Sequence, residues 1–319
     1  MKKQLKRLSL VAGLAFAGLA AAQPYPSKPV HLIVGFTAGG GTDVAARLVA
    51  EPMGKVLGQP VIVENRPGAA GMVGARYVLS QPADGYTIHF GIVNSFTSVF
   101  VKDNPLDPAR DFDPITNIES GGLLFVVRGD LPVNTLRELI EYSKANPGKL
   151  NAATAPGSAS DLLYAVLKDR TKMEFTLLPY QGDAPSITAL LGGVIDVSQA
   201  NISLALPHIK AGKLKAVFYA AERRSSLLPD VPTAAQAGAP GALNQFNLGL
   251  WARKGTPREV IQKLNAAGHA ALKTEAVIET FRKFGVDPVG TTPEDQLRIF
   301  EAEAKANAEA ARLGGMQPR

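Results

Sequence analysis

The feature that most constrains the fold is an alternation, from Pro24 onward, of short β-branched runs with stretches whose apolar residues recur at helical spacing. In one such stretch, apolar residues between Val44 and Leu57 keep this spacing until Gly58 ends it. Alternation of strands with helices is typical of βαβ units, so we predict an α/β protein with largely parallel sheets. The expected strands are 31–36, 61–64, 87–92, 123–127, 175–178, 194–197, 216–220 and 248–252.

Local signals also mark the starts of helices. Residues 135–138, Thr-Leu-Arg-Glu, fit a capping box, and Pro257 suits the first position of another helix. No internal repeat or low-complexity linker marks a domain boundary. We expect the last part of the chain to be mostly helical and to cover a sheet, over 260–272, 275–284 and 293–313.

The first 22 residues have the composition of a secretory signal peptide. Residues 1–7 carry four basic and no acidic side chains, and residues 8–22 are apolar apart from Ser9. This apolar run is shorter than the roughly 20 residues needed to cross a bilayer, which disfavours the alternative of a membrane anchor. Small residues before Gln23 suit cleavage there, and a lipid anchor would need a Cys that the chain lacks. We therefore expect a soluble, exported chain.

Composition excludes several kinds of chemistry. The chain has no Cys, which removes thiolate nucleophiles, disulfides and thiolate metal sites. Its four His lack the spacing of a metal site, and we expect neither a metal nor a cofactor. The leader holds four of the 34 basic residues, which leaves 30 against 28 acidic ones, and no basic cluster, including 223–224, is longer than two residues. We therefore expect no nucleic-acid partner.

Residues 36–43, Phe-Thr-Ala-Gly-Gly-Gly-Thr-Asp, lie between an expected strand and an expected helix. Glycines let a ligand approach the backbone, and free amides at a helix start favour an anion such as a carboxylate or a phosphate. The loop lacks the Lys of a P-loop and the spacing of a dinucleotide fingerprint. The alternative is that Thr42 or Asp43 only caps the helix.

A second junction of this kind spans residues 151–161, which are rich in Gly, Ser and Thr. Its hydroxyl groups and opening amides could bind another acidic group, and the alternative is that Ser158 or Ser160 caps a helix. Ligands of α/β sheets bind beyond the carboxyl ends of the strands. Two such loops in separate parts of the chain therefore suggest a cleft between domains.

Catalytic signals are weak. Residues 157–161 do not form a Gly-x-Ser-x-Gly elbow, so a serine hydrolase has no recognisable nucleophile. Asp107, Asp111 and Asp113 lack the Gly and Glu of a calcium loop and are interpreted as solvated turn residues. We expect Trp251 to lie in the core. The chain is therefore not expected to be an enzyme, and a secreted hydrolase is kept only as a distant alternative.

Short motifs follow one another along nearly the whole chain after the leader. They include 25–29 (YPSKP), 36–43 (FTAGGGTD), 57–69 (LGQPVIVENRPGA), 83–87 (ADGYT), 145–151 (ANPGKLN), 206–214 (LPHIKAGKL) and 228–233 (LPDVPT). In this set and order the chain resembles the solute-binding proteins of tripartite tricarboxylate transporters, the TctC/Bug family.

This resemblance implies a type II periplasmic binding protein, with two α/β domains and a ligand cleft between them. The first domain would combine residues 23–123 with 245–319, and the second would span 124–244. A monomer located in the periplasm is implied as well.

The resemblance further implies a pocket built from four segments: the two junctions described above, the loop after the 87–92 strand, and the segment after Asp196. Asp161 stands where many relatives have His, and Ala200 stands where many have an acid. We hypothesise that these departures change the ligand class, and the alternative is that Asp161 points to solvent as an acid of the first helical turn. The implied ligand-binding residues are Phe36, Ala38, Gly39, Gly40, Thr42, Asp43, Val93, Asn94, Ser95, Ala155, Gly157, Ser158, Ser160, Asp161, Gln199 and Ala200.

The implied function is capture of a small carboxylate or aromatic acid by closure of the cleft, as in a Venus flytrap. The ligand would then be delivered to a membrane permease of the tripartite tricarboxylate type. The alternative is an orphan receptor that presents its bound form to a membrane sensor kinase, and the sequence does not separate the two.

Overall fold

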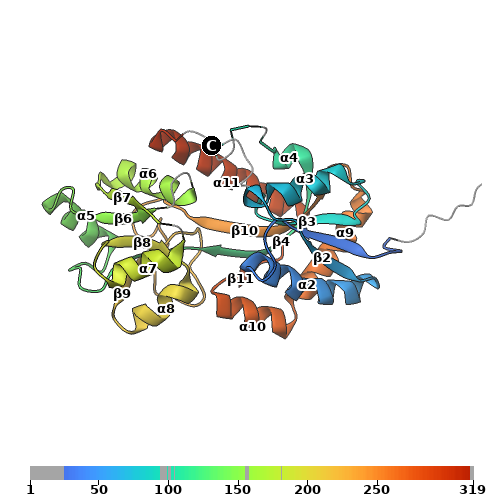
Figure 1. Cartoon of the computed structure of the whole chain (residues 1–319), viewed down its shortest axis with the longest axis horizontal. Coiled ribbons are helices and arrows are strands. Elements are labelled where there is room, and N and C mark those ends of the chain that lie inside the picture. Colours follow the sequence, from blue (N-terminus) through green and yellow to red (C-terminus); the bar gives the residue numbers. More distant parts are fainter. Residues whose placement is uncertain are drawn as a thin grey trace, which may run out of the picture.

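The computed structural model contains two β-sheets, each covered by helices on both faces (Figure 1). It describes residues 25–93, 99, 102–103, 105–154, 158–180 and 182–316. The two sheets with their helices confirm the predicted α/β fold class. The expected leader, 1–22, lies outside the described residues. Within the described ranges, none of the helices has the length and apolar character needed to cross a membrane.

The first sheet has six strands in the order β11-β4-β10-β3-β1-β2. β1 is parallel to β2 and β3, whereas β10 is antiparallel to β3 and β4, and β11 is antiparallel to β4. The sheet is therefore mixed. Because the second sheet also contains antiparallel pairs, the prediction of largely parallel sheets is wrong. Its strands are β1 (Val30–Val34), β2 (Val61–Asn65), β3 (Thr87–Gly91), β4 (Phe112–Gly122), β10 (Gln245–Arg253) and β11 (Asp287–Pro288).

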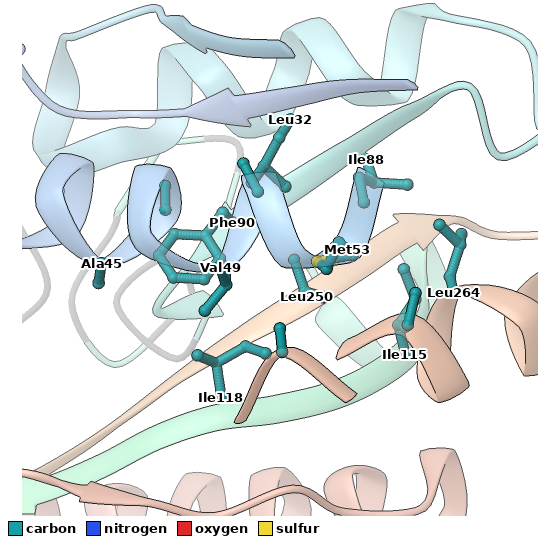
Figure 2. Packing of buried hydrophobic residues seen from close by; sticks show 14 of the residues in the cluster. Leu32, Ala45, Val49, Met53, Ile88, Phe90, Ile115, Ile118, Leu250 and Leu264 are labelled. Atoms are coloured by element: carbon teal, nitrogen blue, oxygen red, sulfur yellow. The ribbon is translucent and has the colours of Figure 1, made fainter. Parts of the chain in front are cut away.

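Alternation along β1 explains why both faces of this sheet are covered. Leu32 and Val34 belong to an apolar cluster on one face, whereas Ile33 belongs to a cluster on the other. Val49 of α2 lies near Phe90 of the sheet in the first cluster (Figure 2). This face carries α2 (Gly41–Leu57), α9 (Arg258–Leu272) and α10 (Glu275–Phe284), and the other carries α3 (Met72–Ser80), α4 (Pro108–Asp111) and part of α11 (Pro293–Gly314). The short helix η1 (Ala69–Gly71) leads into α3.

The second sheet has five strands in the order β7-β6-β8-β5-β9, with β5 antiparallel to both of its neighbours. Phe125 and Val127 face the cluster that includes α5 and α6, whereas Leu124 and Val126 face the cluster of α7 and α8. The strands are β5 (Leu124–Arg128), β6 (Asn151–Thr154), β7 (Thr176–Pro179), β8 (Val197–Ala200) and β9 (Leu214–Tyr219). The helices are α5 (Leu136–Ala145), α6 (Ala159–Thr171), α7 (Asp183–Leu191) and α8 (Ile202–Lys210).

The chain passes between the sheets at two adjacent points. Leu123 separates β4 from β5, and Asn244 comes directly before β10. The Leu123 amide donates to the Asn244 carbonyl at 3.0 Å, and the Ala220 amide donates to the Leu123 carbonyl at 2.9 Å. β4 leaves the first sheet and β10 returns to it, so these crossing strands pair in opposite directions. The return of the chain is therefore the reason that the first sheet is not all parallel.

Several strands differ from those expected from the sequence. β4 and β6 were not predicted, and the strand expected at 194–197 begins only at Val197. Val194 is 60% exposed, whereas the polar side chains of Ser198 and Gln199 are buried. Just before β8, the Asp196 carboxylate accepts hydrogen bonds from Arg128 Nε and from the Asn151 amide, both at 2.9 Å. These partners place the strand three residues later than the apolar pattern indicates.

Helix α11 packs against both halves of the molecule (Figure 1). On the first sheet, Phe300 contacts Trp251 edge to face with ring centroids 6.0 Å apart. Trp251 is 3% exposed, which confirms its expected place in the core. Farther along the helix, Ala310 belongs to the cluster that contains α6. We expected the last helices to cover one sheet, but α11 reaches from the first sheet to a helix of the second.

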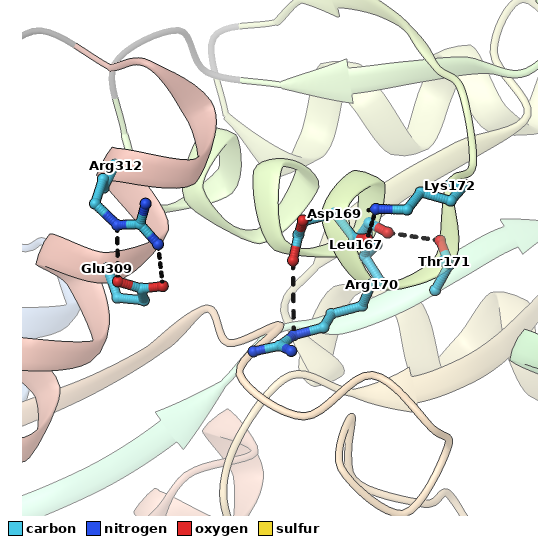
Figure 3. Close-up of polar contacts among 7 residues, drawn as sticks. All are labelled: Leu167, Asp169, Arg170, Thr171, Lys172, Glu309 and Arg312. Carbon is cyan, nitrogen blue, oxygen red and sulfur yellow. Dashed lines mark hydrogen bonds and ion pairs between the residues drawn. The ribbon is translucent and has the colours of Figure 1, made fainter.

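The contact of α11 with α6 combines close packing with opposite charges. A Cβ atom added to Gly314 would lie 2.9 Å from the Cβ of Ala165, so the two backbones are close there. Figure 3 shows the Glu309–Arg312 pair of α11, 2.8 Å apart, beside the α6 turn that carries Asp169. The hydrogen bonds that Arg312 donates to Glu309 raise the pKa of Arg312 most, and the charge of Asp169 adds to this increase.

Candidate functional site

The loop after β1 is held in place by the carboxylate of Asp43. This side chain is buried and accepts hydrogen bonds from the Gly39 amide at 2.9 Å, Arg47 Nε at 3.0 Å and Asn65 Nδ2 at 2.8 Å. Burial opposes the charge of Asp43, but these hydrogen bonds outweigh burial and lower the pKa of the carboxyl group. Because its oxygens already have protein partners, Asp43 fixes the shape of the loop.

Helix α2 begins without a cap from a side chain. Its N-cap is Gly40, so the alternative in which Thr42 or Asp43 occupies that position is wrong. Gly39 has a φ of 83°, a left-handed conformation that glycine adopts without strain. The first-turn amides therefore have no hydrogen bond from a side-chain cap, and the negative charge of Asp43 lies in the same turn.

The other residues predicted near this loop have different surroundings. Phe36 is half-buried and packs against the apolar cluster on the α2 face of the first sheet, whereas Ala38 is exposed. Val93 is buried on the opposite face of the sheet and lines a small cavity beneath α11. Asn94 and Ser95 lie outside the described residues.

At the second junction, hydroxyl groups and a carboxylate form one hydrogen-bonded group. Ser158 is the N-cap of α6 and accepts a hydrogen bond from the Ser160 amide at 3.2 Å. Thr154 Oγ1 donates to Asp161 Oδ1 at 2.5 Å and lies 3.1 Å from Ser160 Oγ. The helix-cap alternative is therefore confirmed for Ser158. Residues 155–157, which include the predicted Ala155 and Gly157, are outside the described ranges.

A cavity of about 140 Å³ opens beside this group, at the point where the chain crosses between the sheets. The structure brings three predicted residues to it, namely Ser158, Ser160 and Gln199. The other residues of its lining are Leu123, Ala153, Thr154, Tyr180, Gly182, Asp183, Ser186, Ser198 and Asn244. None of these side chains is basic, and the polar ones carry hydroxyl, amide and acidic groups beside the apolar Leu123 and Ala153.

Hydrogen bonds within the lining fix which atoms can face a ligand. Ser186 Oγ donates to the Asp183 carbonyl at 2.8 Å, and Ser198 Oγ donates to the Gln199 carbonyl at 3.2 Å. The Asp183 carboxylate accepts from the Asn201 amide at 2.9 Å and from Asn201 Nδ2 at 2.6 Å, both on one oxygen. Because these two hydroxyl protons are already donated, Ser186 and Ser198 can only accept further hydrogen bonds. The Tyr180 hydroxyl and the uncapped first turn of α7 can donate.

Gln199 connects the cavity to the crossing point. Its Oε1 accepts a hydrogen bond from Asn244 Nδ2 at 2.6 Å, and its Nε2 donates to the Ser160 carbonyl at 3.4 Å. Asn244 and Asp183 lie in no motif that we used to predict the site. The sequence signal that could have identified Asn244 is its polar side chain directly before the apolar strand at the start of the last part of the chain.

The two positions that depart from the family pattern have different surroundings. Asp161 is half-buried and accepts the hydrogen bond from Thr154. Ala200 is fully buried in the apolar cluster of α7 and α8 and is not part of the cavity lining. Among the described residues, no group of three or more His, Cys, Asp or Glu could hold a metal ion.

Another buried acid lies in the crossing strand β4. Glu119 is 7% exposed, and burial raises the pKa of its carboxyl group to about 7. Its backbone pairs with Leu248 of β10 in the ladder between the crossing strands.

Comparison with known proteins identifies the family. The model of the tripartite tricarboxylate transporter family receptor, TctC, matches residues 45–311. The chain belongs to the TctC family. This confirms the resemblance seen in the motifs, and the members of the family are periplasmic solute-binding receptors.

Relatives of this TctC receptor include proteins with bound carboxylates. Protein BugT of Bordetella pertussis is 36% identical over 308 residues, which cover 94% of both chains. Rpa4515 of R. palustris with adipate has a TM-score of 0.73 at 32% identity, covering 92% of this chain and 100% of its own. MatC (Rpa3494) from Rhodopseudomonas palustris with bound malate has a TM-score of 0.68 at 32% identity, covering 90% and 99%. The TctC receptor thus has the fold of the periplasmic solute-binding proteins.

Proposed function

We propose that this protein is exported by its leader, captures a small carboxylate in the periplasm and delivers it to a tripartite tricarboxylate permease. The observation that carries the proposal is the start of α2, where the amides are free of a side-chain cap and Asp43 holds the preceding loop. Family membership supports it, and so do the adipate and malate bound to two structural neighbours. A carboxylate at this helix start would gain hydrogen bonds and a favourable dipole.

The cavity beside Ser158 supports a more specific ligand. Its wall carries Asp183, with Asp161 close by, and the hydroxyl groups of Ser186 and Ser198 can only accept. Near these acidic groups a second carboxylate is repelled and a hydrogen-bond donor is favoured. We therefore propose a ligand that carries a hydroxyl or amino group at the end opposite its carboxylate.

The proposed mechanism is closure of two domains, 23–123 with 245–319 and 124–244, around the ligand. The hinge lies at Leu123 and Asn244, where each connection between the sheets is a single extended segment. A ligand that contacts both domains binds the closed form more tightly and shifts the equilibrium toward it by that difference. The pocket residues inferred from the family resemblance remain part of this proposal.

Thermal unfolding with a panel of ligands tests the binding function. The protein is unfolded and refolded to remove carried ligand, then mixed with adipate, malate, citrate, aspartate, an aromatic acid or a neutral sugar. A ligand at about 100 times its dissociation constant stabilises the fold by about 2.7 kcal/mol. We expect a carboxylate with a hydroxyl or amino group to give the largest increase in Tm. An increase in Tm with the sugar alone, or no increase with any of the acids, would contradict the proposal.

A matched pair of serine variants tests the site. Ser158→Ala removes a hydroxyl group of the cavity and should weaken binding by about 2-fold to 10-fold, the value of one hydrogen bond. Ser80→Ala removes a hydroxyl group that donates only to the Tyr77 carbonyl at 2.7 Å, and it should leave affinity unchanged. Equal affinities of the two variants would place the ligand elsewhere.

Delivery is tested separately, by uptake of the bound carboxylate in a strain that lacks the gene. We expect uptake to fall and to be restored by the intact gene. Unchanged uptake, together with confirmed binding, would refute delivery and favour presentation to a membrane sensor kinase.

A further inference from the structure

A second, much smaller cavity lies where the crossing strands meet α11. Its volume is about 10 Å³, which is close to the least that admits one water molecule. It is separate from the cavity beside Ser158, with which it shares no residue. Its lining consists of Val93, Asn117, Asn247, Trp251, Gln296, Ile299, Phe300 and Glu303.

A chain of hydrogen bonds fixes the orientation of two asparagines at this cavity. Asn247 Nδ2 donates to Glu303 Oε2 at 3.0 Å, and Asn117 Nδ2 donates to Asn247 Oδ1 at 2.9 Å. A carboxylate oxygen accepts, so the amide of Asn247 must turn its nitrogen toward Glu303. The amide of Asn117 must then turn its nitrogen toward Asn247. Asn117 Oδ1 is left as a buried acceptor without a partner among the described residues.

Two further buried polar groups also lack a hydrogen-bond partner among the described residues. Gln296 Nε2 donates to the Leu250 carbonyl at 3.3 Å, which leaves Gln296 Oε1 as an acceptor without a partner in the described structure. Trp251 Nε1, which can only donate, also has no partner there. Trp251, Gln296 and Asn117 are each at most 3% exposed. A buried polar group without a hydrogen bond costs about 1–3 kcal/mol, so three such groups around one cavity need an explanation.

We propose that this cavity binds one ordered water molecule, which accepts a hydrogen bond from Trp251 and donates one each to Asn117 and Gln296. The two acceptors, Asn117 Oδ1 and Gln296 Oε1, and the one donor, Trp251 Nε1, match a single water molecule, which can donate two hydrogen bonds and accept one or two. A metal ion does not fit, because the indole N–H presents its positive end to the cavity. An ammonium ion does not fit either, because it cannot accept the indole proton. The water completes the hydrogen bonding of a junction that the protein alone leaves unsatisfied.

The site joins three elements that carry the connection between the sheets. Asn117 belongs to β4, Trp251 belongs to β10, and Gln296 belongs to α11. A bound water therefore ties the start of α11 to both crossing strands at once. Removing one of its three partners weakens this tie without touching the cavity beside Ser158.

A crystal structure of the unaltered protein tests the site without any substitution. We expect an electron-density peak within about 2.6–3.2 Å of Trp251 Nε1, Asn117 Oδ1 and Gln296 Oε1. Rotation of any of these side chains onto a protein partner would overturn the proposal. A peak with the short distances and high coordination number of a metal ion would overturn it as well.

Nuclear magnetic resonance tests the site in solution, because Trp251 is the single tryptophan and gives one indole N–H signal. We expect a cross peak from this proton to water that has the sign of the diagonal in NOESY and the opposite sign in ROESY. That combination identifies a long-lived bound water and not proton exchange. No cross peak, or one with the exchange sign in both spectra, would overturn the proposal.

A pair of α11 variants shows whether the cross peak comes from this site. Gln296→Leu keeps the size of the side chain but removes one acceptor, so the cross peak should be lost. Lys305→Leu changes an exposed residue of the same helix and should leave both the peak and its position unchanged. A peak of full strength in the folded Gln296→Leu protein would place its source elsewhere and refute the assignment.

Discussion

Replacing Asp43 by Ala should destabilise the protein strongly, although the residue lies at a loop and not in an apolar core. The substitution removes the side-chain acceptor of the Gly39 amide and one of the two acceptors of Asn65 Nδ2, which keeps the Phe36 carbonyl at 3.0 Å. A buried hydrogen bond to a charged group contributes about 1.5–3 kcal/mol, and the exposed Gly39 amide loses about 0.5–1.5 kcal/mol because water can replace the carboxylate. Arg47 is 52% exposed and can turn to water, so its ion pair adds less than about 1 kcal/mol. The expected loss in the free energy of unfolding is therefore about 2–5 kcal/mol.

Thermal and urea unfolding of two variants measure this loss. Asp295 is a matched control because, like Asp43, it is the third residue of its helix, but its side chain is 46% exposed. Asp295→Ala should cost less than about 1 kcal/mol. A loss of about 2–5 kcal/mol lowers Tm by roughly 4–20 °C for a cooperative unit of 150–250 residues. If Asp43→Ala and Asp295→Ala unfold within about 0.5 kcal/mol of each other, Asp43 does not hold the loop, and the reasoning fails.

Three other substitutions have defined outcomes. The pKa of Glu119, about 7, lies above that of an unfolded glutamate, about 4.3, so the unfolding free energy should fall as pH rises between these values. Glu119→Gln should remove this slope and be more stable than the parent at pH 8, and urea titrations at pH 5 and pH 8 check it. Gly35→Ala places a Cβ 2.5 Å from the Cα of Gly71 and should cost about 1–3 kcal/mol in urea unfolding; a neutral result would contradict the close approach. Phe125→Ala removes a buried ring stacked 4.6 Å from Phe218 and should cost about 3–5 kcal/mol by calorimetry, with a loss below 1 kcal/mol as the contrary result.

The sequence predicts a strand best where the strand is apolar and its partner strands follow soon after it in the chain. β1 was expected at 31–36 and is found at Val30–Val34, because its alternating apolar residues are buried on both faces of the sheet. β4 was missed because its sequence contains Pro114, Ser120 and two glycines. Its main partner is β10, more than 100 residues away in the chain, and no local pattern encodes such a pairing.

In the candidate site, too, local features could be predicted from the sequence, whereas contacts between distant segments could not. Glycines followed by a helix pattern correctly indicated an amide-rich loop, because that signal is local. The same pattern could not show that Asp43 takes three hydrogen bonds, since one of them comes from Asn65 of the neighbouring strand. Asn244 reaches the cavity only because β10 returns to the first sheet beside Leu123. Contacts created by topology are therefore the part that one sequence alone does not reveal.

Helix α11 has a consequence for any relative motion of the two sheets. Its 22 residues extend about 33 Å, with Phe300 fixed on the first sheet and Ala310 packed against α6. Any change in the angle between the sheets must therefore be accommodated within α11 or at its contact with α6. That contact contains small residues, Ala165, Ala310 and Gly314, which do not interlock as large side chains do. The close approach of α11 to α6 thus opposes any turn of the two halves that would separate these helices.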